Sequence, residues 1–268
     1  HTFFNCRAGS REGILDPVEP WIVLPEAKDG KNWWGGQIWM DNAKRYIYSF
    51  AAYETESLWF NANLAKAEDF QSFDDLLNPK WQGKIGFSDP RTPGSGASMW
   101  SYIRSIKGEA FLKNLVGQKM FISRDLRVLA ENIAREKIAI AIGLIYADFA
   151  PYLKAGMPIR PLPRPKEGMY VTTGYGNLMV LKNAPHANAA RLFINWFLSK
   201  EGQEVYTQGM AEPSRRLDVD ASALKKFGIS AAKDIMNIDE FYRRENQSEE
   251  KVYKVRAPGA ELARKLLD

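Results

Sequence analysis

The stretch from Lys84 to Trp100 carries the residue types that could hold a charged ligand. It reads as a short strand, a loop rich in proline and glycine, and the start of a helix. Gly94 and Gly96 allow a close backbone approach, and Ser95 or Ser98 is expected to cap the helix. The first N–H groups of a helix have no partner within the helix and attract anions. The stretch therefore predicts a binding site for a small anion.

The composition argues against several kinds of catalytic and metal chemistry. The 268 residues include two histidines and a single cysteine, Cys6. A histidine-based zinc site, a Ser-His-Asp triad and a disulfide framework are therefore not expected. The pattern places no pair of carboxylates around a shared substrate. We therefore predict no catalytic residues, no cofactor and no enzyme activity.

The charge pattern bears on which partners the protein can have. Lys and Arg number 37 against 32 Asp and Glu, which gives a formal net charge of +5. The basic residues are scattered and are not interleaved with aromatic residues, so nucleic acid is not an expected partner. No apolar run reaches the roughly 20 residues that a membrane-spanning helix needs, so no direct membrane insertion is expected. The first residues also lack the pattern of a signal peptide.

Strands alternate with helices along most of the chain. A continuous apolar run at 138–144 predicts a strand buried on both faces, and 170–181 predicts a strand interrupted at Gly174 and Gly176. The spacing of apolar residues predicts helices at 98–107 and 109–116 on either side of Gly108, and at 125–135, 149–155 and 187–199. This alternation predicts an α/β fold with largely parallel strand pairing.

Tyr146, Arg124 and Asp125 are candidate ligand-binding residues. Tyr146 follows the buried strand at its carboxyl end, where open α/β sheets bind ligands, although a packed aromatic residue is an equal alternative. Arg124 precedes a predicted helix, together with Asp125, and could donate charge-assisted hydrogen bonds to a carboxylate or phosphate. An ordinary surface arginine is the alternative reading.

The strand that returns at 170–181 is interrupted by polar residues. Thr173, Tyr175 and Asn177 are typical of a strand that lines a binding site. A bulged edge strand is the alternative, and the glycines at 174 and 176 would also explain it.

Two blocks of the sequence resemble a known family. The first runs from Ser72 to Pro90 and continues into Pro93–Ala97, and the second is Gly176–Gln203. Together they are similar to the family 1 extracellular solute-binding proteins of bacterial ABC importers, in particular the ferric-iron and related anion-binding branch. The resemblance covers roughly residues 10–210.

The resemblance implies a type 2 periplasmic-binding-protein-like clamshell with two α/β lobes and the ligand between them. Residues 1–57 and 173–212 would form the first lobe with the hinge strands, and residues 58–172 and 213–268 the second. The first lobe is expected to be incomplete and to lack its N-terminal part, which makes self-association through that lobe possible. The resemblance also implies a periplasmic or extracellular location and a membrane permease as partner.

The resemblance also assigns roles to individual residues. Ser95, Gly96 and Ala97 match the Ser-Gly-Ala stretch that holds the anion in ferric-binding members. A polar residue in the region of Arg124 and Asp125 reaches that anion in the same branch. Tyr146 lies where that branch carries two metal-binding tyrosines; only one is present here, so no metal site is predicted unless the ligand is ferric.

The function implied is that of a receptor for a small anionic ligand. The ligand classes are a carboxylate, a phosphonate or phosphate ester, or a metal–anion complex. Two alternatives stay open at this point: an enzyme that uses the glycine-rich loop on a phosphorylated small molecule, and a sensory binding module of the same fold.

Overall fold

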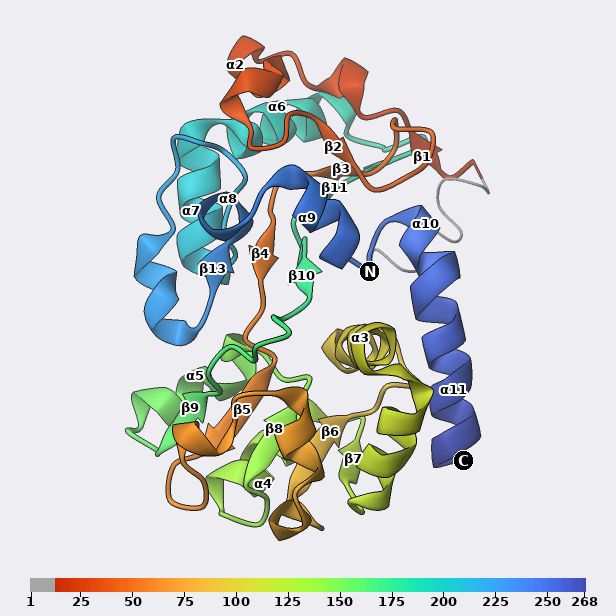
Figure 1. Cartoon of the computed structure of the whole chain (residues 1–268). Coiled ribbons are helices and arrows are strands. Elements are labelled where there is room, and N and C mark those ends of the chain that lie inside the picture. Colours follow the sequence, from red (N-terminus) through yellow and green to blue (C-terminus); the bar gives the residue numbers. More distant parts are fainter. Residues whose placement is uncertain (1–12) are drawn as a thin grey trace. The chain divides into compact units, whose positions relative to one another are not determined.

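The computed structural model describes residues 13–268, which form two compact units (Figure 1). The first unit contains the described residues up to Glu54 together with Val171–Tyr253. The second contains Thr55–Tyr170 and Lys254–Asp268. The chain therefore crosses from one unit to the other three times, as it leaves, returns and leaves again.

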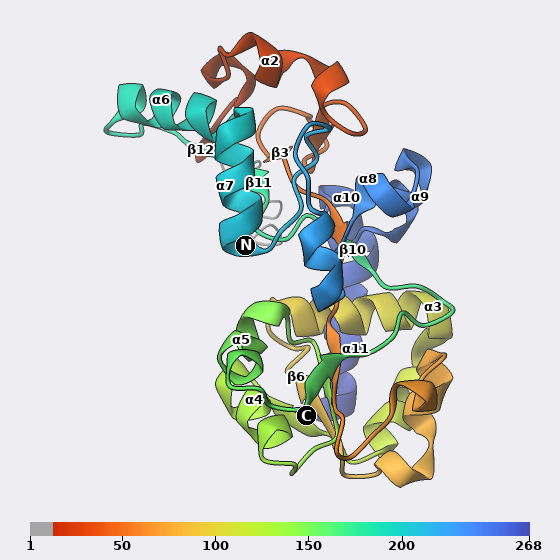
Figure 2. The same cartoon turned by 90° about the vertical axis from the view of Figure 1, so that its left-hand side faces the viewer.

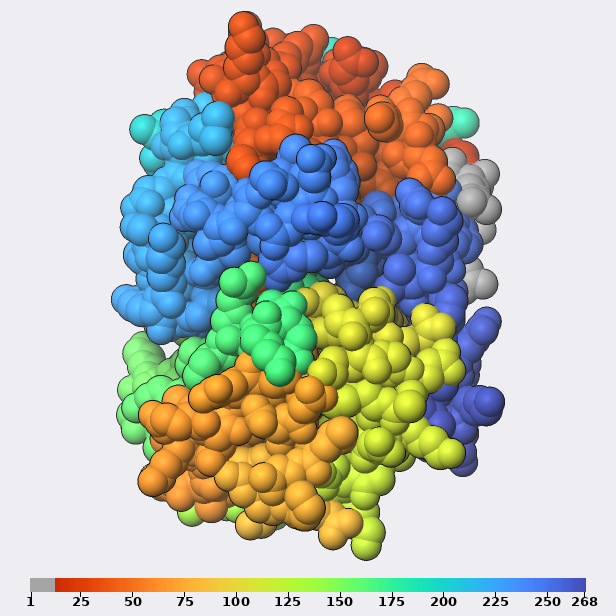
Figure 3. Space-filling view, in the orientation of Figure 1, coloured from red at the N-terminus to blue at the C-terminus, as the bar shows by residue number. Residues whose placement is uncertain are grey.

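The C-terminal region differs from the sequence-based division, which placed all of 213–268 in the second lobe. Residues up to Tyr253 belong to the first unit. They are held there because Ser230–Ala231 pairs with Tyr53–Glu54 and because Phe241 is fully buried in that unit's core. In Figure 3 this segment, in blue, forms part of the visible surface of the first unit.

The second unit is built on one mixed five-stranded sheet. Its strands, in spatial order, are β7 (Phe121–Ser123), β6 (Ile85–Ser88), β8 (Ile140–Ile142), β5 (Leu58–Asn61) and β9 (Ile159–Pro161). The first three are parallel, whereas β5 is antiparallel to both of its neighbours. All three residues of β8 are fully buried, which confirms the prediction of a strand covered on both faces.

Four helices accompany this sheet: α3 (Ser95–Gly117), α4 (Leu126–Ala134), α5 (Tyr146–Lys154) and α11 (Ala257–Leu267). Gly108, with φ of 80°, divides α3 into two helical segments, as the sequence predicts. The helix α5 begins three residues earlier than predicted. It does so because the Asp148 carboxylate accepts the Ile145 N–H at 2.8 Å and caps the helix there.

The first unit contains three small sheets of short strands. Their spatial orders are β1 (Leu15–Asp16)–β12 (Val180–Leu181), β11 (Asn177–Leu178)–β3 (Tyr48–Ser49)–β2 (Ile38–Trp39), and β10 (Val171–Thr172)–β4 (Tyr53–Glu54)–β13 (Ser230–Ala231). All pairs are antiparallel. The predicted strand at 170–181 is thus divided into β10, β11 and β12, and the first break falls at Gly174 and Gly176.

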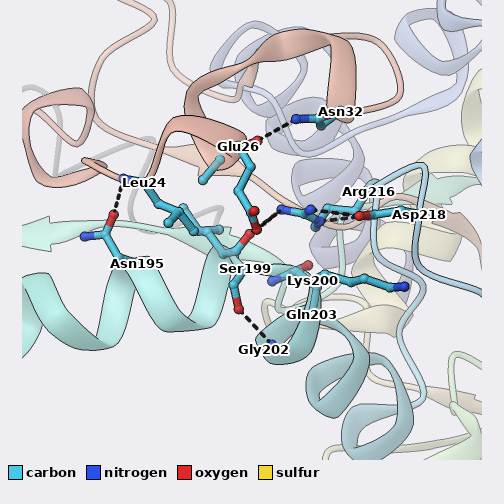
Figure 4. A network of polar contacts seen from close by, with 12 residues as sticks. Leu24, Glu26, Asn32, Asn195, Ser199, Lys200, Gly202, Gln203, Arg216 and Asp218 are labelled. Carbon is cyan, nitrogen blue, oxygen red and sulfur yellow. Dashed lines mark hydrogen bonds and ion pairs between the residues drawn. The ribbon is translucent and has the colours of Figure 1, made fainter.

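Six helices complete the first unit: α2 (Pro25–Lys28), α6 (Ala187–Leu198), α7 (Lys200–Met210), α8 (Ala232–Ile235), α9 (Ile238–Arg244) and α10 (Glu249–Lys251). The predicted helix at 187–199 is confirmed as α6, which reaches outward at the edge of the unit in Figure 2. Polar side chains from α6 and from the segment around Arg216 contact α2 and the residue before it. Figure 4 shows the Arg216 guanidinium between Asp218, at 2.9 Å, and Glu26, at 3.5 Å. The Asn195 side chain of α6 accepts the Leu24 N–H at 2.8 Å.

Candidate functional site

The start of α3 is packed against the carboxyl ends of two parallel strands. Gly96, in the first turn, approaches Ser88 at the end of β6 so closely that a Cβ atom would lie 2.2 Å from the Ser88 carbonyl oxygen. Gly143, which follows β8 with φ of +82°, has no room for a Cβ atom against Gly96. Only glycine fits this approach. The two glycines therefore bring the N-terminus of α3 to the edge of the sheet where ligands bind in α/β folds.

The first turn of α3 presents backbone donors. The first backbone hydrogen bond of the helix runs from the Ser98 N–H to the Gly94 carbonyl at 3.1 Å. The N–H groups of Ser95, Gly96 and Ala97 precede it, as the first N–H groups of any helix do. The Ser95 hydroxyl donates to the Gly143 carbonyl instead of capping the helix. The predicted serine cap is therefore wrong, and Gly94 is the N-cap residue.

A buried cation, missed by the sequence analysis, contacts the same turn. Arg256 is 5% exposed, and its guanidinium donates to the Ser98 hydroxyl at 2.9 Å. Burial lowers the pKa of Arg256 to about 10, so it carries its charge at neutral pH. The helix macrodipole and this charge both favour an anion near the first turn. Arg256 lies 158 residues from Ser98, so no local pattern could have linked them.

Arg124 lies at this edge but has a carboxylate partner. Its Nε donates to Asp89 at 3.0 Å while its side chain is 70% exposed. Arg91 also donates to Asp89, at 2.8 and 2.9 Å, and pairs with Asp268 at 2.6 Å. Burial raises the pKa of Asp89, but the hydrogen bonds from both arginines outweigh it and hold the pKa at about 2. Asp89 is therefore ionised and offsets part of the positive charge.

Asp125 acts as a helix cap. It is the N-cap residue of α4, and its carboxylate accepts the Arg127 N–H at 2.9 Å. An N-cap aspartate satisfies one of the open N–H groups of its helix. Its predicted contact with a ligand stays a prediction.

Tyr146 is the first residue of α5, and its N–H donates to the carboxylate of Glu56. Glu56 is buried, with 6% exposure, and the sequence analysis did not identify it. Its position in the polar run Thr55-Glu56-Ser57, directly before β5, is the one signal that could have pointed to it. The N-terminus of α5 is thus occupied by a carboxylate of the protein, whereas the N-terminus of α3 carries open donors.

The predicted residues of the first unit form a tight turn that is held from two sides. The Gln247 side-chain oxygen accepts the N–H and the hydroxyl of Thr173, both at 2.7 Å. The side-chain amide of Asn177 donates to the Thr173 hydroxyl at 2.8 Å. The Tyr175 N–H donates to the buried Glu212 carboxyl group at 3.0 Å, while the Tyr175 side chain is 60% exposed. Gln247 and Glu212 were both missed.

The predicted site residues therefore fall into two groups. Ser95, Gly96 and Ala97 lie together at the carboxyl edge of the parallel strands in the second unit, where Arg124 and Tyr146 follow β7 and β8. Thr173, Tyr175 and Asn177 form a separate turn in the first unit.

Two further kinds of feature are absent from the described part of the chain. Across residues 13–268, no three His, Cys, Asp or Glu side chains gather closely enough to hold a metal ion. Within the same residues, no helix combines the length and the apolar character needed to cross a membrane.

Solved structures of bacterial binding proteins share this architecture. Iron-bound HitA from Pseudomonas aeruginosa superposes with a TM-score of 0.65 and 19% identity, over 100% of this chain and 80% of HitA. AfuA from Actinobacillus pleuropneumoniae, with fructose-6-phosphate bound, gives 0.62 and 20% over 97% and 77%. The substrate-binding protein of an ABC transporter from Agrobacterium tumefaciens gives 0.71 and 11% over 99% and 75%. The fold is therefore that of the type 2 periplasmic binding proteins.

The sequence places the chain within one family of this class. Residues 39–209, more than half of the chain, match the family of bacterial extracellular solute-binding proteins, and the chain belongs to that family. An uncharacterized protein from Haemophilus influenzae is 31% identical over 150 residues, which are 54% of this chain and 42% of that protein. The match thus spans less than half of the relative's length. The family is one of extracellular solute-binding proteins, and the neighbour from Agrobacterium tumefaciens is described as the substrate-binding protein of an ABC transporter.

Proposed function

We propose that the protein is the solute-binding receptor of an ABC import system and that it captures a small anionic ligand. The anion would be held by the N-terminus of α3 in the second unit. The observation that carries this proposal is the first turn of α3, where the N–H groups of Ser95, Gly96 and Ala97 precede the helix and the buried Arg256 contacts Ser98. Backbone donors with a fixed positive charge behind them suit oxyanions.

The ligand classes that fit this turn are carboxylates, phosphonates and phosphate esters. Three neighbouring N–H groups match the oxygens of one anionic group. A phosphate ester is favoured because AfuA, of the same fold, is described with fructose-6-phosphate bound. A metal–anion complex is less favoured, although HitA is described as iron-bound, since Tyr146 is the single tyrosine in the stretch Leu144–Asp148 that follows β8.

A titration with anions tests this assignment. Inorganic phosphate, fructose 6-phosphate, citrate and ferric citrate would each be added to the 268-residue protein, with melting temperature and heat of binding as readouts. A ligand that binds the folded state raises its stability. We expect at least one anion to bind, and Ser95→Asp to abolish that binding because it places a carboxylate among the helix donors.

The matched control is Ser105→Asp, which introduces the same charge on an exposed part of α3. Binding should survive in this variant. Equal loss in both variants would show that the turn is not the site. No binding of any of the four anions to the wild-type protein would refute the proposed function.

We further propose that the receptor works in the periplasm or outside the cell and passes its ligand to a membrane permease. Membership of an extracellular solute-binding family supports this. Fractionation of cells that express a tagged protein tests the location. Uptake of the bound anion, measured in a strain without the permease, tests the partnership. Uptake that persists without the permease contradicts the partnership.

Self-association is a further part of this proposal, with a second copy as the partner. On α6, the side chains of Leu192, Phe193 and Trp196 are 75%, 54% and 40% exposed and lie within one helical turn. Contiguous exposed apolar side chains mark association surfaces, and a two-fold dimer brings the same patch of both copies together. Light scattering should show a dimer that dissociates on dilution and is lost in Phe193→Asp. A monomer at every concentration refutes it.

A further inference from the structure

A buried carboxyl group in the first unit is surrounded by hydrogen-bond donors from three elements. Glu212 is 4% exposed and follows α7. It accepts the hydroxyl of Tyr53 from β4 at 3.1 Å and the hydroxyl of Tyr206 from α7. It also accepts the Tyr175 N–H, at 3.2 and 3.0 Å to its two oxygens. These contacts fix the turn that follows β10 to the strand and helix beside it.

The turn fits closely over this carboxyl group. Gly174 has φ of +55°, and a Cβ atom there would lie 2.4 Å from a carboxyl oxygen of Glu212 and 2.5 Å from the Tyr53 hydroxyl. Glycine is therefore required twice, for its backbone conformation and for the lack of space. In the closed turn, water has little access to the carboxyl group.

The groups that face Glu212 do not compensate a negative charge. They are the hydroxyls of Tyr53 on β4 and Tyr206 on α7, and the backbone N–H of Tyr175 in the turn. Among the described residues, no Lys, Arg or His side chain pairs with Glu212. Burial raises its pKa to about 7 against its ordinary 4.5, and the hydrogen bonds from Tyr206, Tyr175 and Tyr53 offset only part of this effect.

We propose that Glu212 is a proton-operated latch for the Thr173–Asn177 turn. A proton on its carboxyl group keeps the turn closed over it. Loss of the proton to solvent leaves a buried anion, whose hydration is recovered only when the turn opens. The turn is a short connection between β10 and β11, in which Tyr175 is exposed whereas Thr173 and Gly176 are buried. Opening is expected to be local because connecting segments open at lower free energy than the core.

The sign of the pH dependence follows from linkage. The closed turn binds the proton more tightly than the open turn, where the carboxyl group has its ordinary pKa of 4.5. The preference for the closed turn is therefore complete below pH 4.5 and is lost as the pH rises toward 7. Between these limits the ratio of closed to open turn falls by about tenfold per pH unit.

Hydrogen exchange of the turn's amides measures this ratio directly. Peptides that cover Thr173–Asn177 would be followed between pH 5 and pH 8, with rates corrected for intrinsic exchange. We expect protection to fall by about tenfold per unit up to neutral pH and then to level off. Glu212→Gln should remove the slope, because the amide does not ionise. The matched control, Glu201→Gln on the exposed start of α7, should keep it.

Two results of these exchange measurements would overturn the proposal. Protection that is flat in the wild-type protein, or a slope that persists in Glu212→Gln, overturns the proposal. If Glu212→Gln does not fold, Tyr206→Phe decides the matter. Loss of the hydroxyl donor should raise the pKa of Glu212 further and move the step to higher pH, and an unmoved step refutes the latch. None of these measurements needs a ligand, so the result is independent of the proposed function.

Discussion

Replacing Gly96 with alanine tests whether the glycine approach builds the candidate anion site. The new Cβ atom would lie 2.2 Å from the Ser88 carbonyl oxygen and 2.8 Å from its carbonyl carbon. These are backbone atoms of β6 and cannot rotate away. To restore an ordinary contact of 3.4 Å, the start of α3 must move by about 1 Å. We expect the free energy of unfolding to fall by about 3 kcal/mol, which is the upper end of the range for overpacked substitutions.

The matched control is Gly117→Ala at the other end of the same helix. A Cβ atom there meets nothing within 4 Å. Alanine should therefore stabilise the protein by about 0.5–1 kcal/mol through its higher helix propensity. The two substitutions are chemically identical. We expect them to change the free energy of unfolding in opposite directions, because only the new Cβ atom at position 96 meets the sheet.

Urea unfolding, together with hydrogen exchange of the first half of α3, measures both effects. The exchange data are needed because a chain with two units need not unfold in one step. Anion binding gives a second readout, since a shift of about 1 Å breaks hydrogen bonds from the first turn. If Gly96→Ala is as stable as Gly117→Ala, the close approach is not a constraint and the reasoning fails.

Three further predictions concern the charges and hydrogen bonds around the two groups of residues. Asp89→Asn should lower the free energy of unfolding by about 2 kcal/mol at neutral pH. The pKa of Asp89 is lowered from 3.8 to about 2, which contributes stability that is present above pH 3.8 and is lost as the pH falls toward 2. Unfolding titrations in which wild type and variant differ equally at pH 7 and at pH 2 contradict this. Glu56→Gln keeps an acceptor for the Tyr146 N–H but removes a negative charge, so phosphate affinity measured by calorimetry should rise, more at low salt than at high salt; weaker binding would be inconsistent with an anion site. Gln247→Ala removes the acceptor of both Thr173 hydrogen bonds and should destabilise the first unit by about 2 kcal/mol, whereas Gln208→Ala, exposed on α7, should have little effect on the unfolding midpoint.

Local features of the fold were predictable because they are encoded within a few neighbouring residues. The continuous apolar run around β8 reports burial on both faces, and Gly108 divides α3 because its positive φ interrupts the helix. The loop after β6 was also correct in outline, since proline and glycine mark the chain reversal between strand and helix. Each of these signals depends on residue type alone.

The partners of the site residues were not predictable, because they come from distant parts of the chain. Arg256 contacts Ser98 across 158 residues, and Gln247 reaches Thr173 across 74. The C-terminal region that supplies both carries ordinary polar and helical patterns in the sequence. The assignment of 213–253 to the wrong lobe had the same cause: β13 is two residues long, too short for its pairing to leave a sequence signal.

The charges around the candidate site favour backbone recognition of the anion over side-chain recognition. Arg124, the most obvious cation in the sequence, already donates to Asp89, and Arg91 shares the same carboxylate. What remains at the first turn of α3 is a set of N–H groups fixed by Gly96 and supported by Arg256 through Ser98. Such donors recognise the shape and charge of an oxyanion but not the rest of the molecule. The motif of this loop therefore predicts that an anion is held, and we expect the choice among anions to depend on side chains elsewhere in the chain.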